Sequence, residues 1–184
     1  MKELSLNILD IVENSVKAKA TLTEILLTET GNLLTVTIRD NGHGMDEQTL
    51  LSVTNPFYTT RTTRKVGLGI PLYKLAAEQT GGTLTITSTV DKQDGSDHGT
   101  CVVATFYTDH FDFAPLGDIV STLVTLVQGH PDTDFLFLHE KDGNTLATMD
   151  TREMREVLGE DVPLDTFEVI VWLGEMLREQ YTNQ

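Results

Sequence analysis

Hydrophobic residues recur with two different periods along this chain, and the changes of period separate predicted helices from predicted strands. Near the N-terminus, a helix over about residues 4–19 is predicted by apolar residues at helical spacing: Leu6, Leu9, Val12 and Val16. The next segment, "TEILLTETGNLLTVTIRD", has two β-prone runs around Gly31-Asn32, which predicts a β-hairpin.

Residues 40–107 contain further predicted elements. A short helix is expected near 46–53, and a second over 72–80 that stops at Gly81-Gly82. Strand composition follows in "TLTITSTV" and "TCVVATFY", with the polar turn "DKQDGSDHG" between them. The loop 55–71 is rich in Thr, Arg and Gly. This order predicts an α+β fold, a two-layer α/β sandwich with a mixed, largely antiparallel sheet.

After residue 108 the pattern starts again. The segment 109–117 reads as a linker or docking segment, and Asp118 as the capping acid of the helix "IVSTLVTLVQG". A hairpin around Asp142-Gly143-Asn144 and two helices, "TREMREVLG" and "LDTFEVIVWLGEMLREQ", complete the chain. We therefore predict a domain over 1–108, a linker over 109–117 and a small α/β domain over 118–184.

The last predicted helix has an apolar pattern that is interpreted most simply as core: Phe167, Ile170, Val171, Leu173 and Leu177. Trp172 is interpreted as a packing residue or as an interface anchor. The acidic residues of this region are expected to form a solvated surface, with recruitment of a basic partner as the alternative.

Charge is distributed unevenly, and this limits the classes of partner. The chain of 184 residues has a formal net charge of −15. Residues 1–108 hold 12 acidic residues against 9 Lys or Arg, and residues 109–184 hold 16 against 4. Phosphate backbones would be repelled, so we expect no nucleic-acid partner. No apolar run is long enough for a membrane span, and the single Cys101 suits the reducing cytoplasm.

The first predicted helix also contains a polar stripe. Asp10, Asn14 and Lys17 lie three or four residues apart, so they share one face. An amide oxygen can bind Mg²⁺, an ammonium can bind phosphate, and a carboxylate can orient a water or hydroxyl group. Alone, however, the stripe is interpreted more simply as an ordinary solvated helix face.

Three glycine-containing segments add to this pattern. In "DNGHGM", Asp40 ends a predicted strand, and Gly42 and Gly44 allow a flat ring to approach the backbone, although Asp-Asn-Gly is also turn-prone. In "VGLGI", glycines precede a helix whose first N–H groups could bind phosphate, with Arg61 and Lys65 nearby. The third segment, Gly99-Thr100, opens the last strand of the first region.

Taken in order, these motifs resemble the GHKL ATPase superfamily, which includes histidine-kinase catalytic domains, gyrase-type topoisomerases, Hsp90-type chaperones and mismatch-repair clamps. The motifs are Asp-x-x-x-Asn-x-x-Lys, Asp-x-Gly-x-Gly, Phe-x-Thr-Thr, Gly-x-Gly and Gly-Thr, within residues 5–107. The resemblance implies the Bergerat fold, with ATP held between a helix layer and a lid. It also implies Mg²⁺ as cofactor.

The resemblance assigns roles to individual residues. Asn14 would be the Mg²⁺ ligand, Lys17 a phosphate contact, and Asp40 the acceptor for the adenine amine. The other implied nucleotide-binding residues are Gly42, Gly44, Met45, Phe57, Arg61, Lys65, Gly67, Leu68, Gly69 and Thr100. Clamp-type ATPases have Glu where this chain has Asp10, so Asp10 is the candidate catalytic base, one methylene shorter.

The loop between Phe57 and Gly67 is short, which favours the histidine-kinase branch over clamps with longer lids. Because the sequence begins at the N-box helix, we expect a stand-alone domain without dimerisation helices or a phosphoacceptor histidine. The expected function is phosphoryl transfer from Mg-ATP to a separate protein acceptor, as in two-component or anti-sigma signalling. An ATP-gated clamp and a non-catalytic nucleotide sensor remain the alternatives.

Overall fold

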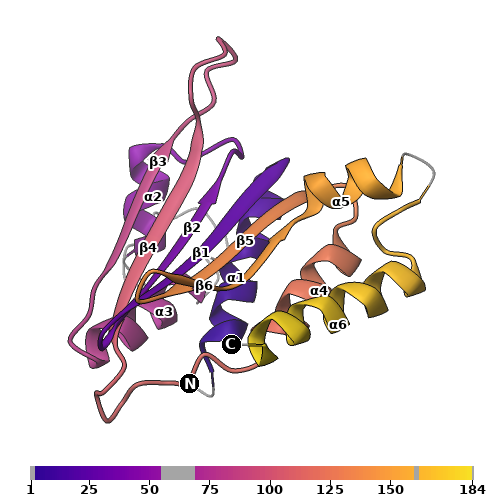
Figure 1. Ribbon diagram of the computed structural model, residues 1–184. Coiled ribbons are helices and arrows are strands. Elements are labelled where there is room, and N and C mark those ends of the chain that lie inside the picture. The colour runs from indigo at the N-terminus through magenta and orange to yellow at the C-terminus, as the bar shows by residue number, and fades with distance from the viewer. Residues whose placement is uncertain (1–2, 55–68, 160–161, 184) are drawn as a thin grey trace.

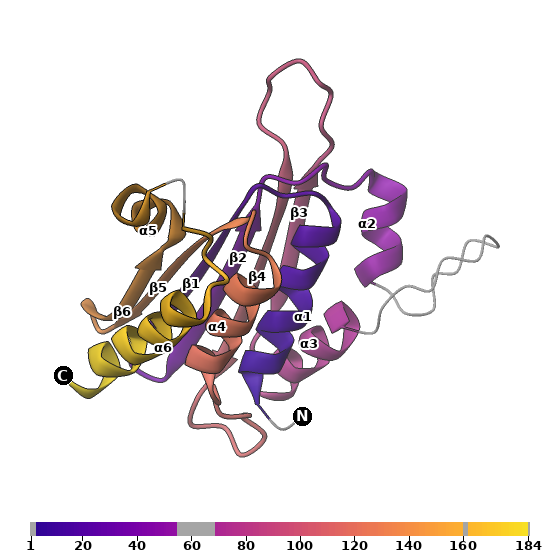
Figure 2. The same cartoon turned by 90° about the vertical axis from the view of Figure 1, so that its right-hand side faces the viewer.

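A single sheet with all its helices on one face makes up the protein in the computed structural model (Figures 1 and 2), which describes residues 3–54, 69–159 and 162–183. Its elements, in chain order, are α1 (Leu4–Lys17), β1 (Leu22–Thr30), β2 (Leu33–Asp40), α2 (Glu47–Thr54), α3 (Gly69–Gln79), β3 (Leu84–Thr89), β4 (Gly99–Tyr107), α4 (Ile119–Gly129), β5 (Asp134–Lys141), β6 (Asn144–Asp150), α5 (Thr151–Leu158) and α6 (Phe167–Thr182).

The sheet has the strand order β3-β4-β2-β1-β5-β6. Four of its five strand pairs are antiparallel, and β1 and β5 form the parallel pair. In the centre, Ile25 of β1 lies opposite Ile38 of β2 on one side and Phe137 of β5 on the other. The predicted α+β class with a mixed, largely antiparallel sheet is confirmed.

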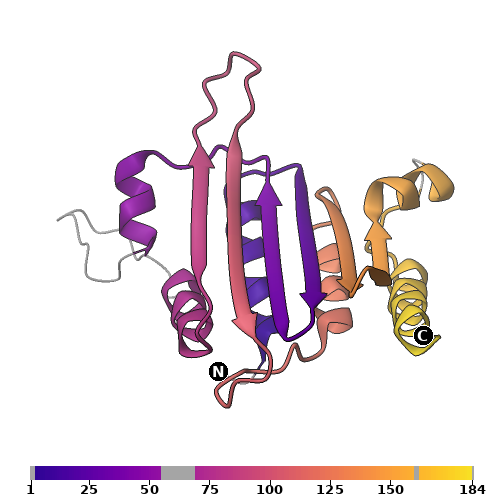
Figure 3. The same ribbon diagram turned by 60° about the vertical axis from the view of Figure 1, so that its left-hand side comes forward.

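Alternation along the strands separates the two faces of the sheet. On β1 and β2, every second residue is buried beneath the helices, including Ile25, Leu27, Val36 and Ile38. These side chains form one continuous apolar cluster with α1, α3, α4 and α6. Figure 3 shows the opposite face of the sheet, over which no described helix passes.

The segments before and after residue 108 share this one sheet, because β5 pairs with β1 along its length. The segment that connects β4 to α4 contacts the start of α1, where the first backbone N–H groups have no partner within the helix. Leu4 N–H donates to the carbonyl of Pro115 (2.9 Å), and Ser5 N–H to that of Leu116 (2.8 Å). The predicted domain boundaries remain a prediction about independent folding units.

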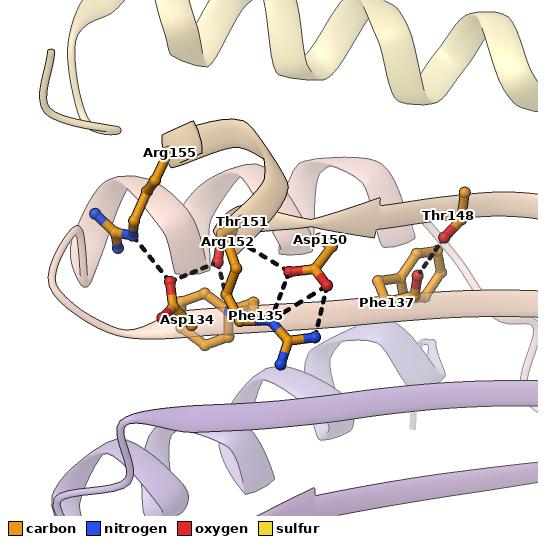
Figure 4. A network of polar contacts seen from close by, with 8 residues as sticks. All are labelled: Asp134, Phe135, Phe137, Thr148, Asp150, Thr151, Arg152 and Arg155. Atoms are coloured by element: carbon orange, nitrogen blue, oxygen red, sulfur yellow. Dashed lines mark hydrogen bonds and ion pairs between the residues drawn. The ribbon is translucent and has the colours of Figure 1, made fainter. Parts of the chain in front are cut away.

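Polar contacts attach α5 to the start of β5 (Figure 4). The buried hydroxyl of Thr151 accepts from Phe135 N–H (2.8 Å) and donates to Oδ1 of Asp134 (3.0 Å). Nε of Arg155 donates to the same Oδ1 (2.9 Å), and Arg152 pairs with Asp150 (2.6 Å). Both arginines of α5 are therefore engaged with acidic residues of β5 and β6.

Three expectations about the helices need correction. Helix α3 begins at Gly69, not at residue 72, because Pro71 falls in the first turn, where its missing N–H costs no hydrogen bond. Helix α1 ends at Lys17, since Lys19 adopts a positive φ of 60°. Phe167 and Val171 do not belong to the core: their exposed fractions are 77% and 40%.

Among the described residues, no helix is long and apolar enough to cross a membrane.

Candidate functional site

Helix α1 presents its polar stripe away from the core. Asp10, Asn14 and Lys17 are exposed, whereas Ile11 and Val12 between them are buried. A Cβ built at Gly69, the first residue of α3, would lie 3.5 Å from Cβ of Asp10 and 3.7 Å from its Oδ2. The carboxylate of Asp10 and the N-terminal end of α3 are therefore neighbours.

Asp40 lies at the end of β2 and is 9% exposed. Its Oδ2 accepts a hydrogen bond from the Ser15 hydroxyl (2.7 Å), and its Oδ1 accepts from the backbone N–H of Gly42 (2.9 Å) and of Thr100 (3.2 Å). The bond to Gly42 is the Asx turn that an Asp-Asn-Gly sequence favours. A carboxylate has about four acceptor positions, so these three donors leave capacity for one more.

A row of polar residues crosses four strands at this point. Thr23 of β1 lies opposite Asp40, Asp40 opposite Thr100 of β4, and Thr100 opposite Ser88 of β3. The hydroxyl groups of Ser88 and Thr100 are 2.9 Å apart. Thr23 is fully buried, and its Oγ1 has no hydrogen-bond partner among the described residues.

The turn after Asp40 packs tightly against neighbouring backbone, and glycine is required at two positions. Gly44 has a φ of +67°, and a Cβ there would lie 1.9 Å from the carbonyl oxygen of Thr89. Gly99 has a φ of +121°, and its Cβ would lie 1.9 Å from the carbonyl oxygen of Asp40. Both distances are far below van der Waals contact.

The same turn also meets the C-terminal end of α1. His43 N–H donates to the carbonyl of Ala18 (2.9 Å), and a Cβ at Gly42 would lie 2.8 Å from that oxygen. Met45 N–H donates to the Ser88 hydroxyl (2.8 Å). Helix α1 thus contacts the turn 40–45 at its C-terminal end and the start of α3 at Asp10.

Several predicted site residues cannot be placed. Phe57, Arg61, Lys65, Gly67 and Leu68 lie outside the described residues. The residues that the sequence interpretation did not assign are Ser15, Thr23 and Ser88, all of which contact or lie in register with the Asp40 row. Only the strand register could have revealed Thr23 and Ser88, and sequence pattern alone does not give it.

A cleft of about 510 Å³ shares Asp40, Ser88 and Thr100 with this row and extends onto the helix-free face of the sheet. Its lining includes Glu24, Arg39 and Cys101, whose positions along their strands alternate with the buried ones and place them on the helix-free face. None of its lining residues comes from α1. We therefore do not assign the nucleotide to this cleft.

Residues 2–110 match the family described as histidine kinase-, DNA gyrase B- and HSP90-like ATPases, and the chain belongs to this family. Its members bind ATP or ADP.

Two curated proteins illustrate the relationship. A sensor protein of Shewanella frigidimarina is 33% identical over 89 residues, which are 46% of this chain and 14% of that protein. The sensor histidine kinase YvrG of Bacillus subtilis is 32% identical over 85 residues, 43% of this chain and 15% of that protein. The chain thus spans about one seventh of the length of the curated relatives it matches.

Solved structures show the same fold. The ATPase domain of Aquifex aeolicus MutL complexed with ADP has a TM-score of 0.54 at 15% identity, covering 86% of this chain and 69% of that one. The N-terminal domain of a DNA repair protein has a TM-score of 0.55 at 17% identity, covering 81% of this chain and 53% of that one. The likeness to MutL spans more of the chain than residues 2–110, so it continues into the second region.

Proposed function

We propose that the protein binds Mg-ATP between α1, the turn 40–45 and the start of α3, and transfers the γ-phosphoryl group to a separate protein acceptor. The observation that carries the proposal is the arrangement of Asp40. A nearly buried carboxylate with three donors and one remaining acceptor position is suited to the exocyclic amine of adenine. Ser15 and the backbone hold this carboxylate in place without a bound ligand.

The exposed stripe of α1 would bind the other end of the nucleotide. Lys17 supplies an ammonium group for phosphate, and Arg61 and Lys65 are proposed for the same task. Among the described residues no group of three or more His, Cys, Asp or Glu could hold a metal ion by itself. We propose that Mg²⁺ is bound mainly through phosphate oxygens of the nucleotide, with the amide oxygen of Asn14 as the protein ligand.

Asp10 is the proposed general base. It lies one helical turn before Asn14 and beside Gly69, so it is near both the proposed metal ligand and the helix start proposed for phosphate. Its carboxylate would accept the proton of the attacking hydroxyl or imidazole group while the γ-phosphorus forms a bond to that nucleophile and its bond to the bridging oxygen breaks, which releases ADP. Mg²⁺, when bound, would neutralise charge on the phosphates.

ATP binding is tested by calorimetric titration of the wild-type protein and of Asp40→Asn. The asparagine amide would point two donors at the donors of Gly42 or Ser15, so we expect affinity to fall at least about tenfold. The exposed Asp112→Asn is the matched control and should bind as the wild type does. Circular dichroism melting of each variant separates lost affinity from unfolding. Unchanged affinity in folded Asp40→Asn would contradict the proposal.

Phosphoryl transfer is tested by incubating the protein with γ-labelled ATP and candidate acceptor proteins. Label on an acceptor that disappears with Asp10→Asn, while ATP binding persists, supports the kinase proposal. Free phosphate without labelled protein would favour a clamp-type ATPase, the class to which the fold likeness to MutL points. Binding with neither product would indicate a nucleotide sensor. We further propose a cytoplasmic location and no nucleic-acid or membrane partner, from the single cysteine and the net charge of −15.

A further inference from the structure

Helix α6 carries large apolar side chains on the side that faces away from the core. Its buried residues Val169, Leu173 and Leu177 recur every fourth position and pack inward. Two other rows of residues, in which successive members are four positions apart, face outward. We call this the α6 outer face, and it consists of Phe167, Glu168, Val171, Trp172, Glu175 and Glu179.

The apolar members of this face are unusually accessible. Phe167 is 77% exposed, Trp172 50% and Val171 40%. Scattered single apolar residues are normal on a protein surface, but two aromatic residues and a valine on adjacent ridges of one helix are typical of an interaction site. Tryptophan is also the residue type most enriched among those that dominate binding energy.

The acidic members of the face lack cationic partners. Within the described residues, no Lys or Arg lies within ion-pair distance of Glu168, Glu175 or Glu179. Three of the four Lys or Arg residues after residue 108 form ion pairs elsewhere. Lys141 pairs with Glu29 (2.9 Å), and the arginines of α5 are held in the network of Figure 4.

Arg178, the remaining cation, turns toward α4. Its Nη1 lies 3.1 Å from the position of a Cβ at Gly174, on the side where Val124 of α4 packs. Hydrogen bonds from Ser121, with a smaller contribution from the charge of Arg178, lower the pKa of Asp118 at the start of α4. The glutamates of the α6 outer face therefore form no ion pair with a described Lys or Arg residue.

We propose that the α6 outer face is the docking surface for a cationic amphipathic segment of another protein. The apolar side of such a segment would cover Phe167, Val171 and Trp172, and its Lys or Arg residues would pair with the three glutamates. A second copy of this chain fits poorly, because a symmetric pair would set glutamates against glutamates and each copy has a net charge of −15.

The docking surface is separate from the proposed nucleotide site. Helix α6 packs on α4 and β6, at the end of the helix layer that lies away from α2 and α3 (Figures 1 and 2). The proposal therefore stands or fails independently of ATP binding and gives the partner a chemical class that the nucleotide site does not specify.

The test uses the intrinsic fluorescence of Trp172, which is the only tryptophan in the chain. The full-length protein is titrated with a helical peptide of Lys and Leu in which the leucines occupy one face. We expect saturable binding with a shift of emission to shorter wavelength, as the indole leaves water. A peptide of the same composition in scrambled order keeps the charge but not the apolar face, and should bind at least about tenfold more weakly. Equal binding of both peptides would overturn the proposal.

Matched variants locate the binding surface. Phe167→Ser and the triple change Glu168→Gln, Glu175→Gln and Glu179→Gln should each weaken peptide binding about tenfold or more. Phe111→Ser removes an even more exposed aromatic residue (97%) from a different segment and should have no effect. Peptide binding unaffected by Phe167→Ser, or self-association of the free protein that shifts Trp172 emission in sedimentation and dilution experiments, would refute the proposal.

Discussion

The hydroxyl of Ser15 donates a 2.7 Å hydrogen bond to Oδ2 of Asp40, and both side chains are buried. Ser15 directly follows Asn14, so α1 presents one residue outward, toward the proposed metal site, and the next inward, to the carboxylate of β2. The two ends of the proposed nucleotide site are thus connected through consecutive residues of one helix.

Ser15→Ala should weaken both the fold and the site. It removes a donor to a buried charged acceptor, so we expect the free energy of unfolding to fall by about 1–3 kcal/mol. ATP affinity should fall several-fold, because the Asp40 carboxylate loses one of the hydrogen-bond donors that fix its orientation. Urea denaturation and calorimetric titration measure the two effects. Ser96→Ala, in the exposed loop between β3 and β4, is the control; equal behaviour of both variants would contradict the role of Ser15.

Gly44→Ala should prevent the turn 40–45 from keeping its conformation. The added Cβ would lie 1.9 Å from a backbone carbonyl, and the φ of +67° is itself unfavourable for alanine. We expect a loss of several kcal/mol in unfolding free energy, or no soluble protein. Gly129→Ala, at the end of α4 with no atom within 4 Å of its Cβ, should be nearly neutral. Similar denaturation midpoints for the two variants would show that the packing at Gly44 is not as described.

The stability of the protein should decrease as the pH falls, in two steps. Burial lowers the pKa of His139 below its ordinary 6.5, although the charge of Glu29 opposes this. Nε2 of the neutral ring donates to Glu29 (3.0 Å), while Nδ1 accepts from the Tyr181 hydroxyl (2.8 Å). The unfolded state binds the proton more readily, so stability is lost between about pH 6.5 and the lowered pKa of His139.

The second step belongs to Glu29. Burial favours its neutral form, but hydrogen bonds from Lys141 and His139 outweigh burial and hold its pKa below the ordinary 4.5. Stability present above pH 4.5 is therefore lost as the pH falls further. Thermal melting across this pH range, compared with His139→Gln, isolates the first step. A variant with the same slope near pH 6 as the wild type would exclude His139 as its origin.

Thr151→Val should destabilise the attachment of α5. The change keeps the shape of the side chain but leaves Phe135 N–H buried without its acceptor, at a cost of about 1–3 kcal/mol. Thr145→Val, on the exposed part of β6, should change the unfolding free energy by less than about 0.5 kcal/mol. Chemical denaturation of both variants measures the difference, and a neutral Thr151→Val would argue against the network of Figure 4.

Local sequence patterns were sufficient to predict most elements of this fold. The hairpin at Gly31-Asn32, the cap at Asp118 and the hairpin around Asp142-Gly143-Asn144 all form where the sequence indicates. The parallel pairing of β1 with β5 was not predicted, because it joins segments more than a hundred residues apart and has no local turn signal. The assignment of Phe167 and Val171 to the core was wrong, since helical spacing alone does not tell which of two apolar stripes faces inward.

The candidate site was predicted mainly from the resemblance of its motifs to a known family, and less from the physical properties of its individual residues. Asp40, Gly42 and Gly44 lie in one turn, where the space beside both glycines is taken by backbone of Ala18 and Thr89, and Asp10 lies beside Gly69. The approach of a flat ring to these glycines stays a prediction. The roles assigned to these residues remain predictions until nucleotide binding is measured. Ser15 was overlooked because serine in a helix carries no sequence signal of its own, and its partner is 25 residues away.

The central position of β1 has a consequence for the region that matches the ATPase family. If the chain ended near residue 108, β1 would become an edge strand with a row of unpaired N–H and C=O groups, and α1 would lose the carbonyls of Pro115 and Leu116. Such a truncated fragment would offer other chains a template for strand pairing and should aggregate. In this protein the acidic C-terminal region therefore also protects the sheet of the ATPase region, because β5 pairs with the strand that would otherwise form its edge.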